Sequence, residues 1–228
     1  MVKVMIHAVP ERMWYVEGFQ IPALERQGAD EIRVWCDDER RGNLRSCMDA
    51  FAACDGDGAT WHIQDDVLLC RDFIERCRSF DDGVVFGFCC VYFLDDPAQT
   101  GRVYMPDAWH SFQCVRIPDA WARECAEWYF SGAWEDALEG AELTVLNAAG
   151  KGDDGFFREF LLERHGDGTV TNAKPNLVEH VDLLLGGSVL HKYRDYPARA
   201  HYWHDELLVA DLRAQLRERR LGSWAPPP

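Results

Sequence analysis

The chain has no excess of positive charge. Its 24 Lys and Arg residues face 39 Asp and Glu residues, which gives a formal net charge of −15 across 228 residues. A protein that binds nucleic acid over a broad surface needs clustered Lys and Arg, so this charge disfavours that class, although a local patch can still hold a nucleic acid. An acidic, solvated surface is the simplest interpretation of the balance.

Long apolar runs and paired-cysteine motifs are absent as well. No run approaches the ~20 apolar residues that span a bilayer, and the N-terminus lacks the long apolar stretch of a signal peptide. Nine cysteines cannot all pair, and no Cys-x-x-Cys spacing occurs. Several cysteines lie in apolar runs, where a free thiol packs as a small core residue. These are Cys47, Cys77, Cys89, Cys114 and Cys125. We therefore expect a reduced, cytoplasmic protein without a membrane span.

Two motifs of phosphate binding and nucleophilic catalysis are also missing. The chain contains no GxxxxGK loop and no GxSxG elbow, so neither of those site types is indicated. A hydrophobic content of 47% with nine tryptophans is typical of a well-packed globular protein. We expect one domain over residues 1–205, followed by a C-terminal helix and Pro-rich tail over 206–228.

The first half alternates short apolar strands with amphipathic helices. This alternation predicts an α/β fold with a mixed, mostly parallel sheet flanked by helices. Pro22 in the first helical stretch predicts a kink or two shorter helices, and Asn43 is the expected N-cap of the second helix. The expected elements are strands over 2–9, 31–36 and 61–69, and helical stretches over 13–28 and after Asn43.

The second half is less regular, and none of its segments repeats an earlier one. Its expected elements are a helix over 72–80, an apolar strand over 83–93, a hairpin or excursion over 95–105, a half-buried strand over 111–117, a helix after Pro118, a loop over 151–155, a helix over 156–164, an apolar segment over 176–188 and a charged helix over 211–220.

Polar residues follow each of the first three expected strands. They are the loop 10–12, the pair Asp37-Asp38 and the pair Asp65-Asp66. Ligands of mostly parallel sheets bind beyond the carboxyl ends of the strands. We therefore expect these three groups to lie together at one edge of the sheet.

The pair Asp65-Asp66 interrupts an apolar stretch. Two uncompensated charges are costly inside a sheet, so we expect the pair to be exposed at a strand end or engaged by a cation. Such a pair can hold a divalent ion that in turn holds a diphosphate. A simple turn is the alternative, because Asp-Asp pairs also occur at 37–38, 81–82, 95–96 and 153–154. The apolar residues on both sides favour the metal site.

Asp153 and Asp154 stand near the start of an expected helix. The helix dipole keeps a carboxylate ionised there, and Gly152 and Gly155 leave room for an acceptor hydroxyl. Asp154 is therefore a candidate general base. In the alternative, Asp153 is an N-cap and Asp154 a first-turn acid.

His180 lies in an apolar segment. A neutral imidazole would complete an oxygen-rich coordination shell that suits manganese, and a hydrogen-bonded core histidine is the alternative. Arg12, Arg41 and Lys192 are candidates for phosphate contacts, and each fits a solvated surface equally well.

The order of these segments resembles that of the GT-A (Rossmann-like) glycosyltransferases of the nucleotide-diphospho-sugar transferase superfamily, in particular small bacterial and bacteriophage members. The similarity extends from Val4 to about Trp203. The segments that carry it are 7–12 (HAVPER), 34–38 (VWCDD), 42–43 (GN), 62–67 (HIQDDV), 152–157 (GDDGFF) and 175–180 (PNLVEH) with 187–188 (GS).

The resemblance implies a donor site and a catalytic base. It implies Asp66 and His180 as ligands of a divalent metal, Mn²⁺ or Mg²⁺, and Asp154 or Asp153 as the base. Gln64 stands where the family's acidic motif has its first acid, which leaves a metal-independent enzyme open. The residues that the resemblance places near the nucleotide-sugar donor are Pro10, Arg12, Asp37, Asp38, Asn43, Gln64, Asp65 and Lys192.

The resemblance also implies transfer of a sugar from a nucleotide diphosphate, first of all UDP, to an acceptor hydroxyl with inversion. The expected acceptor is a hydroxymethylated phage DNA base, a protein or a glycan, in the host cytoplasm if a phage encodes the chain. Two other classes stay open. One is a non-catalytic nucleotide- or sugar-binding module, and the other is a metal-dependent nucleotidyltransferase or phosphohydrolase.

Overall fold

The computed structural model describes most of the first 181 residues. The described residues are 1–87, 101–104, 112–137, 152–166, 169–173, 176–181, 185 and 214. The expected helix over 211–220 (apart from residue 214), the Pro-rich tail, Cys89 and Lys192 lie outside them. No helix within the described residues is both long and apolar enough to cross a membrane.

A seven-stranded sheet forms the centre of the fold, in the order β2-β1-β3-β7-β5-β8-β6. The first three strands pair in parallel, β7 is antiparallel to both β3 and β5, β8 is parallel to β5, and β6 is antiparallel to β8. Five of the seven strands therefore run in one direction, which confirms the predicted mixed, mostly parallel sheet. The strands are β1 (Lys3–Ala8), β2 (Glu31–Cys36), β3 (Ala59–Gln64), β5 (Val85–Phe86), β6 (Gly101–Tyr104), β7 (Cys114–Pro118) and β8 (Thr169–Asn172).

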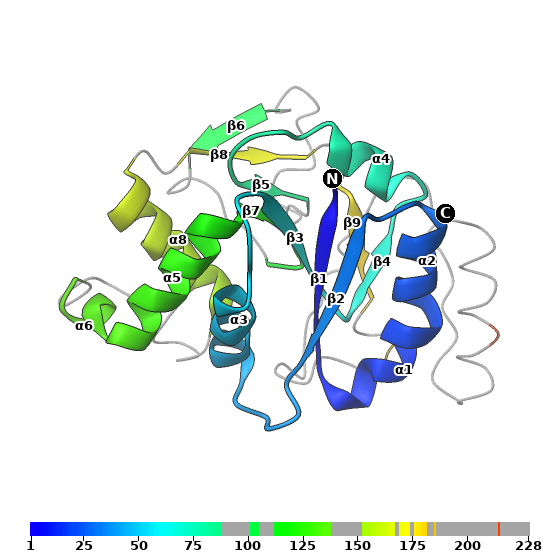
Figure 1. Cartoon of the computed structure of the whole chain (residues 1–228), viewed down its shortest axis with the longest axis horizontal. Coiled ribbons are helices and arrows are strands. Elements are labelled where there is room, and N and C mark those ends of the chain that lie inside the picture. The colour runs from blue at the N-terminus through cyan, green and yellow to red at the C-terminus, as the bar shows by residue number, and fades with distance from the viewer. Residues whose placement is uncertain are drawn as a thin grey trace.

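Helices cover both faces of this sheet, and each layer closes over its own hydrophobic core (Figure 1). One layer contains α1 (Met13–Tyr15), α2 (Ile21–Arg26) and α4 (Phe73–Arg78). The other contains α3 (Asn43–Ala52), α5 (Asp119–Ser131) and α8 (Asp153–His165), with α6 (Ala133–Ala137) after α5. Phe51, Phe156 and Phe160 are fully buried in this second layer. The helical flanks of the predicted α/β fold are thereby confirmed.

The helical stretch after β1 is divided into short pieces. A 3-10 turn, η1 (Pro10–Arg12), precedes α1, and a π-helical turn, η2 (Val16–Gln20), precedes α2. Pro22 lies in the first turn of α2, directly after the π-helical turn, and it has no N–H to donate to that turn. The predicted interruption near Pro22 is confirmed.

The prediction of a single strand over 61–69 is wrong. β3 ends at Gln64 and β4 (Val67–Leu69) begins after a turn at Asp65-Asp66. β4 pairs antiparallel with β9 (Val178–His180) in a separate two-stranded sheet. The apolar residues on both sides of the acidic pair therefore serve two sheets, and the pair forms the corner between them.

Two predicted helix caps are also wrong. Gly42, with a φ of 91°, is the N-cap of α3, so Asn43 is the first residue inside the helix. Gly152 is the N-cap of α8, so this helix begins at Asp153, three residues before the predicted start at Phe156. In both cases a glycine makes the turn, and the polar side chain after it is directed to another contact.

The described cysteines are free, as expected. Cys47, Cys77, Cys114 and Cys125 are buried, and burial raises the pKa of each thiol well above its usual value. These side chains pack as core residues and are poor nucleophiles at neutral pH.

Candidate functional site

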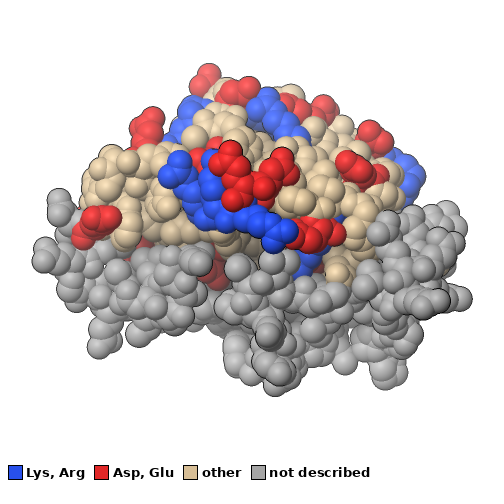
Figure 2. Space-filling model, turned by 90° about the horizontal axis from the view of Figure 1, so that it is seen from below, with Lys and Arg blue, Asp and Glu red and all other residues tan. Residues whose placement is uncertain are grey.

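The carboxyl ends of β1, β2 and β3 meet at one edge of the sheet. The N–H of Asp37 donates to the carbonyl of Ala8 at 2.9 Å, and the N–H of Asp65 donates to the carbonyl of His7 at 2.9 Å. The loop 10–12 and the two acidic pairs therefore lie together, as predicted. Figure 2 views this edge, where acidic and basic side chains are interleaved.

Arg12 joins the two carboxylates of the corner between β3 and β4. A single guanidinium nitrogen, Nη1, lies 2.8 Å from Asp65 Oδ1 and 2.7 Å from Asp66 Oδ2. All three residues are buried, with exposed fractions of 6%, 5% and 7% for Arg12, Asp65 and Asp66. Of the two predicted settings for the acidic pair, exposure is wrong and engagement by a cation is confirmed. In this structure the cation is a residue of the chain itself.

The corner that carries the acidic pair is held from several sides. Tyr15 donates its hydroxyl to the carbonyl of Val67 at 2.9 Å, and the Gln20 amide donates to the carbonyls of Gln64 and Val67 at 2.9 and 3.0 Å. Asp65 Oδ2 accepts the N–H of Val9 at 2.8 Å. Because these contacts come from α1, η2 and the end of β1, the position of the carboxylates is fixed by the fold and not only by Arg12.

Asp65 has a raised pKa of about 6. Burial is the largest cause and the neighbouring charge of Asp66 is the second, while Arg12 acts in the opposite direction. The corner therefore concentrates negative charge in a poorly solvated place and depends on a cation for its stability.

Asp37 is engaged by the backbone of the turn that follows β2. Its carboxylate accepts the N–H groups of Arg41 at 2.9 Å and Gly42 at 3.0 Å. The Arg41 side chain pairs with Asp49 at 2.8 Å. Asp38 is exposed. Asp37 therefore shapes the entrance of α3, and Asp38 is the more accessible of the two predicted nucleoside contacts.

A second acidic group lies at the start of α8. Asn43 donates its amide to Asp153 Oδ1 at 2.7 Å, and the Gln64 amide lies 3.5 Å from Asp153 Oδ2. Asp153 is buried, and burial together with the charge of Asp154 raises its pKa to about 7. Asp154 is partly exposed and accepts the N–H of Gly155 at 2.8 Å. The two candidate general bases, Asp153 and Asp154, are thereby linked to the end of β3, on the same edge as the corner.

His180 lies next to the acidic corner at the level of the backbone. It pairs with Val67 in the β4–β9 sheet, and the N–H of Val181 donates to the carbonyl of Asp66 at 2.7 Å. The pairing of β4 with β9 thus places the backbones of Asp66 and His180, the predicted ligands, close together. Pro10 lies at the exposed rim of the same edge.

The corner suits a divalent ion in the type of its oxygen ligands, with Arg12 standing where a cation is needed. Among the residues whose side chains are described, no group of three His, Cys, Asp or Glu side chains is arranged to hold a metal. The side chain of His180 lies outside that set. A divalent ion would therefore fit this corner only where it replaces the guanidinium of Arg12, beside carboxylates that are already positioned.

Sequence reasoning missed a pair of histidines beneath this edge, of which His62 is fully buried and His7 is partly buried. His7 Nε2 and His62 Nδ1 are 2.8 Å apart, and His62 Nε2 lies 3.8 Å from Cys54 Sγ. Burial lowers the pKa of His7 to about 4 and that of His62 well below its usual value. Both lie on adjacent strands with apolar neighbours, which is the only sign of the pairing in the sequence.

The position of Gln113 beside the candidate site was not predicted from the sequence either. Its carbonyl accepts the N–H of Gln64 at 3.1 Å, so it lies beside the end of β3, and its side chain is buried. The sequence before β7 gives no sign of this position, because the antiparallel pairing of β7 with β3 joins segments that are distant in the chain.

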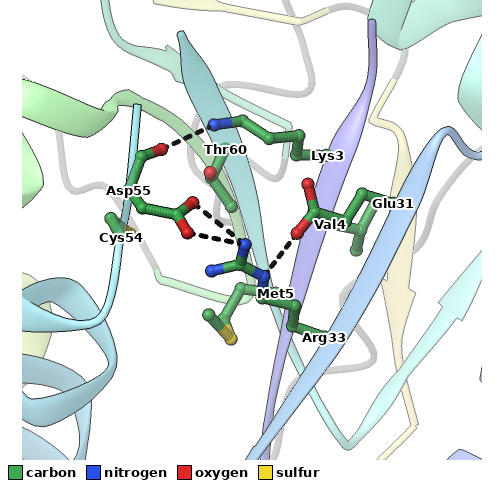
Figure 3. A pocket seen from close by; sticks show the side chains of 8 residues that line it. All are labelled: Lys3, Val4, Met5, Glu31, Arg33, Cys54, Asp55 and Thr60. Atoms are coloured by element: carbon green, nitrogen blue, oxygen red, sulfur yellow. Dashed lines mark hydrogen bonds and ion pairs between the residues drawn. The ribbon is translucent and has the colours of Figure 1, made fainter. Parts of the chain in front are cut away.

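A small pocket at the opposite end of β1 is lined by charged residues (Figure 3). Lys3 contacts Asp119 and donates to the carbonyl of Asp55 at 3.1 Å, and Arg33 pairs with Asp55 at 2.9 Å. Each of these cations already has an acidic partner. The pocket therefore has the character of a structural ion-pair cluster.

Comparisons with known proteins give a likeness in structure alone. No protein-family model matches the chain, and no curated protein matches it. Among solved structures, the chain is similar to a Drosophila β1,4-galactosyltransferase 7 variant in complex with manganese, UDP-galactose and xylobiose. The sequence identity is 12% and the TM-score 0.39, over 90% of this chain and 82% of that chain. Such a likeness does not assign an activity to this protein.

Proposed function

We propose that this protein is a glycosyltransferase that transfers a sugar from a nucleotide-diphosphate donor, first of all a UDP-sugar, to an acceptor hydroxyl. The observation that carries the proposal is the meeting of the Arg12–Asp65–Asp66 corner with Asp153 and Asp154 at the carboxyl edge of the sheet. Ligands of such sheets bind at this edge. A charged diphosphate group needs the cation chemistry of the corner, and an attacking hydroxyl needs a nearby carboxylate.

The donor half of the site is the corner and the loops beside it. Asp66 and His180 would hold a divalent ion, which supplies positive charge to the departing nucleoside diphosphate when it is bound. Asp65 and Gln64 face the donor sugar, and Asp38 with Pro10 lines the nucleoside side. Lys192, outside the described residues, stays a proposed phosphate contact.

Asp154 is the better candidate for the base. It is partly exposed, whereas Asp153 is buried and held by the Asn43 amide. A general base must reach the proton of the acceptor hydroxyl, and exposure permits that contact. Asp153 positions Asp154, because its Oδ1 also accepts the N–H of Asp154 at 3.0 Å. Direct attack with proton removal by Asp154 inverts the anomeric carbon.

The acceptor is proposed to be a hydroxyl compound, with a hydroxymethylated DNA base, a protein and a glycan as the three classes to compare. The net charge of −15 disfavours a broad hold on duplex DNA, so a base presented in a local or single-stranded setting fits better than an intact duplex.

The test is consumption of nucleotide sugars by the purified chain, with NMR of the glycosyl product. Release of nucleoside diphosphate and an inverted anomeric carbon support the proposal. A retained configuration would remove the assigned role of Asp154. Pyrophosphate or phosphate release would instead support a nucleotidyltransferase or phosphohydrolase, and binding without turnover would support a non-catalytic module.

A further inference from the structure

The contact between Arg12 and the acidic corner has a geometry that resembles ion coordination. One nitrogen, Nη1, touches Asp65 Oδ1 at 2.8 Å and Asp66 Oδ2 at 2.7 Å. A divalent ion held by Asp66 would need the carboxylate that Nη1 now contacts. The guanidinium and such an ion would therefore compete for Asp66.

The net charge of the acidic corner limits how a nucleotide-diphosphate donor can bind there. With both carboxylates ionised, Arg12, Asp65 and Asp66 sum to one negative charge, in a place where each is more than nine-tenths buried. Adding a diphosphate alone would increase an uncompensated negative charge in a poorly solvated site, which is costly. Adding a divalent ion beside a guanidinium that stays in place would crowd two cations onto the same oxygens. An exchange avoids both costs.

We infer that Arg12 is a resident counter-cation that the metal–diphosphate displaces. In the donor-free protein, Arg12 neutralises the acidic corner. When the nucleotide diphosphate binds with a divalent ion, the guanidinium would leave the carboxylates and donate to the diphosphate, and Asp66 would then hold the ion. This inference rests on the proposed function and extends it, because it makes tight metal binding depend on the nucleotide.

The surroundings of the corner permit this exchange. Asp65 keeps a second partner, the N–H of Val9 at 2.8 Å, so it stays in position without Arg12. The turn itself is held by Tyr15 and Gln20 through backbone carbonyls. Arg12 is the last residue of the short η1 turn, next to exposed Pro10 and Glu11, so its side chain can swing without unfolding a long helix.

The test measures Mn²⁺ binding by electron paramagnetic resonance, with and without UDP, in the full-length wild type and in Arg12→Gln. We expect wild type to bind Mn²⁺ alone weakly. Arg12→Gln should bind Mn²⁺ alone about tenfold more tightly or better, because the competing cation is gone, and should bind Mn²⁺-UDP less tightly. Arg40→Gln is the matched control. Arg40 lies at the same edge but pairs with exposed Glu11, so this change should leave Mn²⁺ binding as in wild type.

Arg12→Lys keeps the inference testable if Arg12→Gln does not fold. A single nitrogen bridges both carboxylates in wild type, so an ammonium group should still block Mn²⁺ alone. It lacks the further donors of a guanidinium, so Mn²⁺-UDP should bind about tenfold less tightly. Equal affinity of wild type and the Arg12 variants, for Mn²⁺ alone and for Mn²⁺-UDP, would overturn the exchange while leaving the proposed function intact. If wild type bound neither Mn²⁺ nor any nucleotide, the proposed function would fail with it.

Discussion

Asn43 and Asp153 lie 110 positions apart in the chain, and their side chains hydrogen bond at 2.7 Å. The contact joins the first residue of α3 to the first residue of α8 and aligns both helix starts with the end of β3. Neither residue is the N-cap of its own helix. The glycine before each one makes the turn, and the polar groups bind each other across the site.

Asn43→Ala should lower the free energy of unfolding by about 1–3 kcal/mol, because it leaves the buried Asp153 carboxylate without its amide donor. Asn43→Asp should lower it further, since a like charge then faces Asp153. Urea unfolding with circular dichroism measures both. Wild-type stability of Asn43→Asp would show that the contact does not form in solution.

Asp153 should make the protein less stable as the pH rises from about 4 to about 8. Its pKa in the folded state is raised to about 7, so the folded protein holds this proton over a range where the unfolded chain has lost it. Its stabilising effect is fully present below the unfolded pKa and is lost as the pH rises through about 7. Asp153→Asn should therefore gain stability relative to wild type between pH 5 and 8, by about 2 kcal/mol. A relative stability that does not change with pH would contradict the buried setting.

His62, which is buried beside His7, should change the stability of the protein with pH in the opposite direction. The pKa of His62 is lowered well below its usual value by burial, so the unfolded chain binds a proton that the folded chain refuses. The stability from a neutral His62 is present above about pH 6.5 and is lost as the pH falls below it. His62→Gln keeps a hydrogen-bonding amide and cannot titrate. It should lose less stability than wild type between pH 6.5 and 4.5, measured by thermal unfolding, and a parallel loss in both proteins would contradict a buried, neutral His62 in the folded protein.

Asp154→Asn should lower the rate of sugar transfer by about 10²- to 10⁴-fold, because an amide cannot take the proton of the acceptor. Affinity for the nucleotide should stay close to wild type, since Asp154 is not part of the donor corner. Asp57→Asn is the control for loss of one acidic charge, because Asp57 is exposed in the loop before β3. Transfer at the wild-type rate by Asp154→Asn would return the role of base to Asp153 or to another group.

Much of the sheet, and the meeting of the polar loops at one edge, could be predicted because both depend on local pattern. The strand 31–36 was placed with its observed bounds, and the parallel alternation brought Asp37 and Asp65 to one edge. Contacts between distant segments were beyond such a pattern. Arg12 lies 53 positions from Asp65, and nothing in either segment indicates that one guanidinium nitrogen serves both carboxylates.

The break in the expected strand 61–69 has the same origin. Both halves are apolar, so periodicity alone favours one continuous strand. The structure divides it because β9 offers Val67–Leu69 a second partner, and because two carboxylates are better held in a turn with Arg12 than within a ladder. The caps at Gly42 and Gly152 were missed because the choice between a glycine and the polar residue after it depends on where that side chain finds a partner.

The most direct test of the donor site is calorimetric binding of a panel of nucleoside diphosphates with Mn²⁺ to wild type, Asp66→Asn and Asp57→Asn. We predict that at least one nucleotide binds wild type and Asp57→Asn with similar affinity and binds Asp66→Asn about tenfold more weakly or not at all. Equal binding by wild type and Asp66→Asn, or no binding of any nucleoside diphosphate to wild type, would contradict a donor site at the acidic corner.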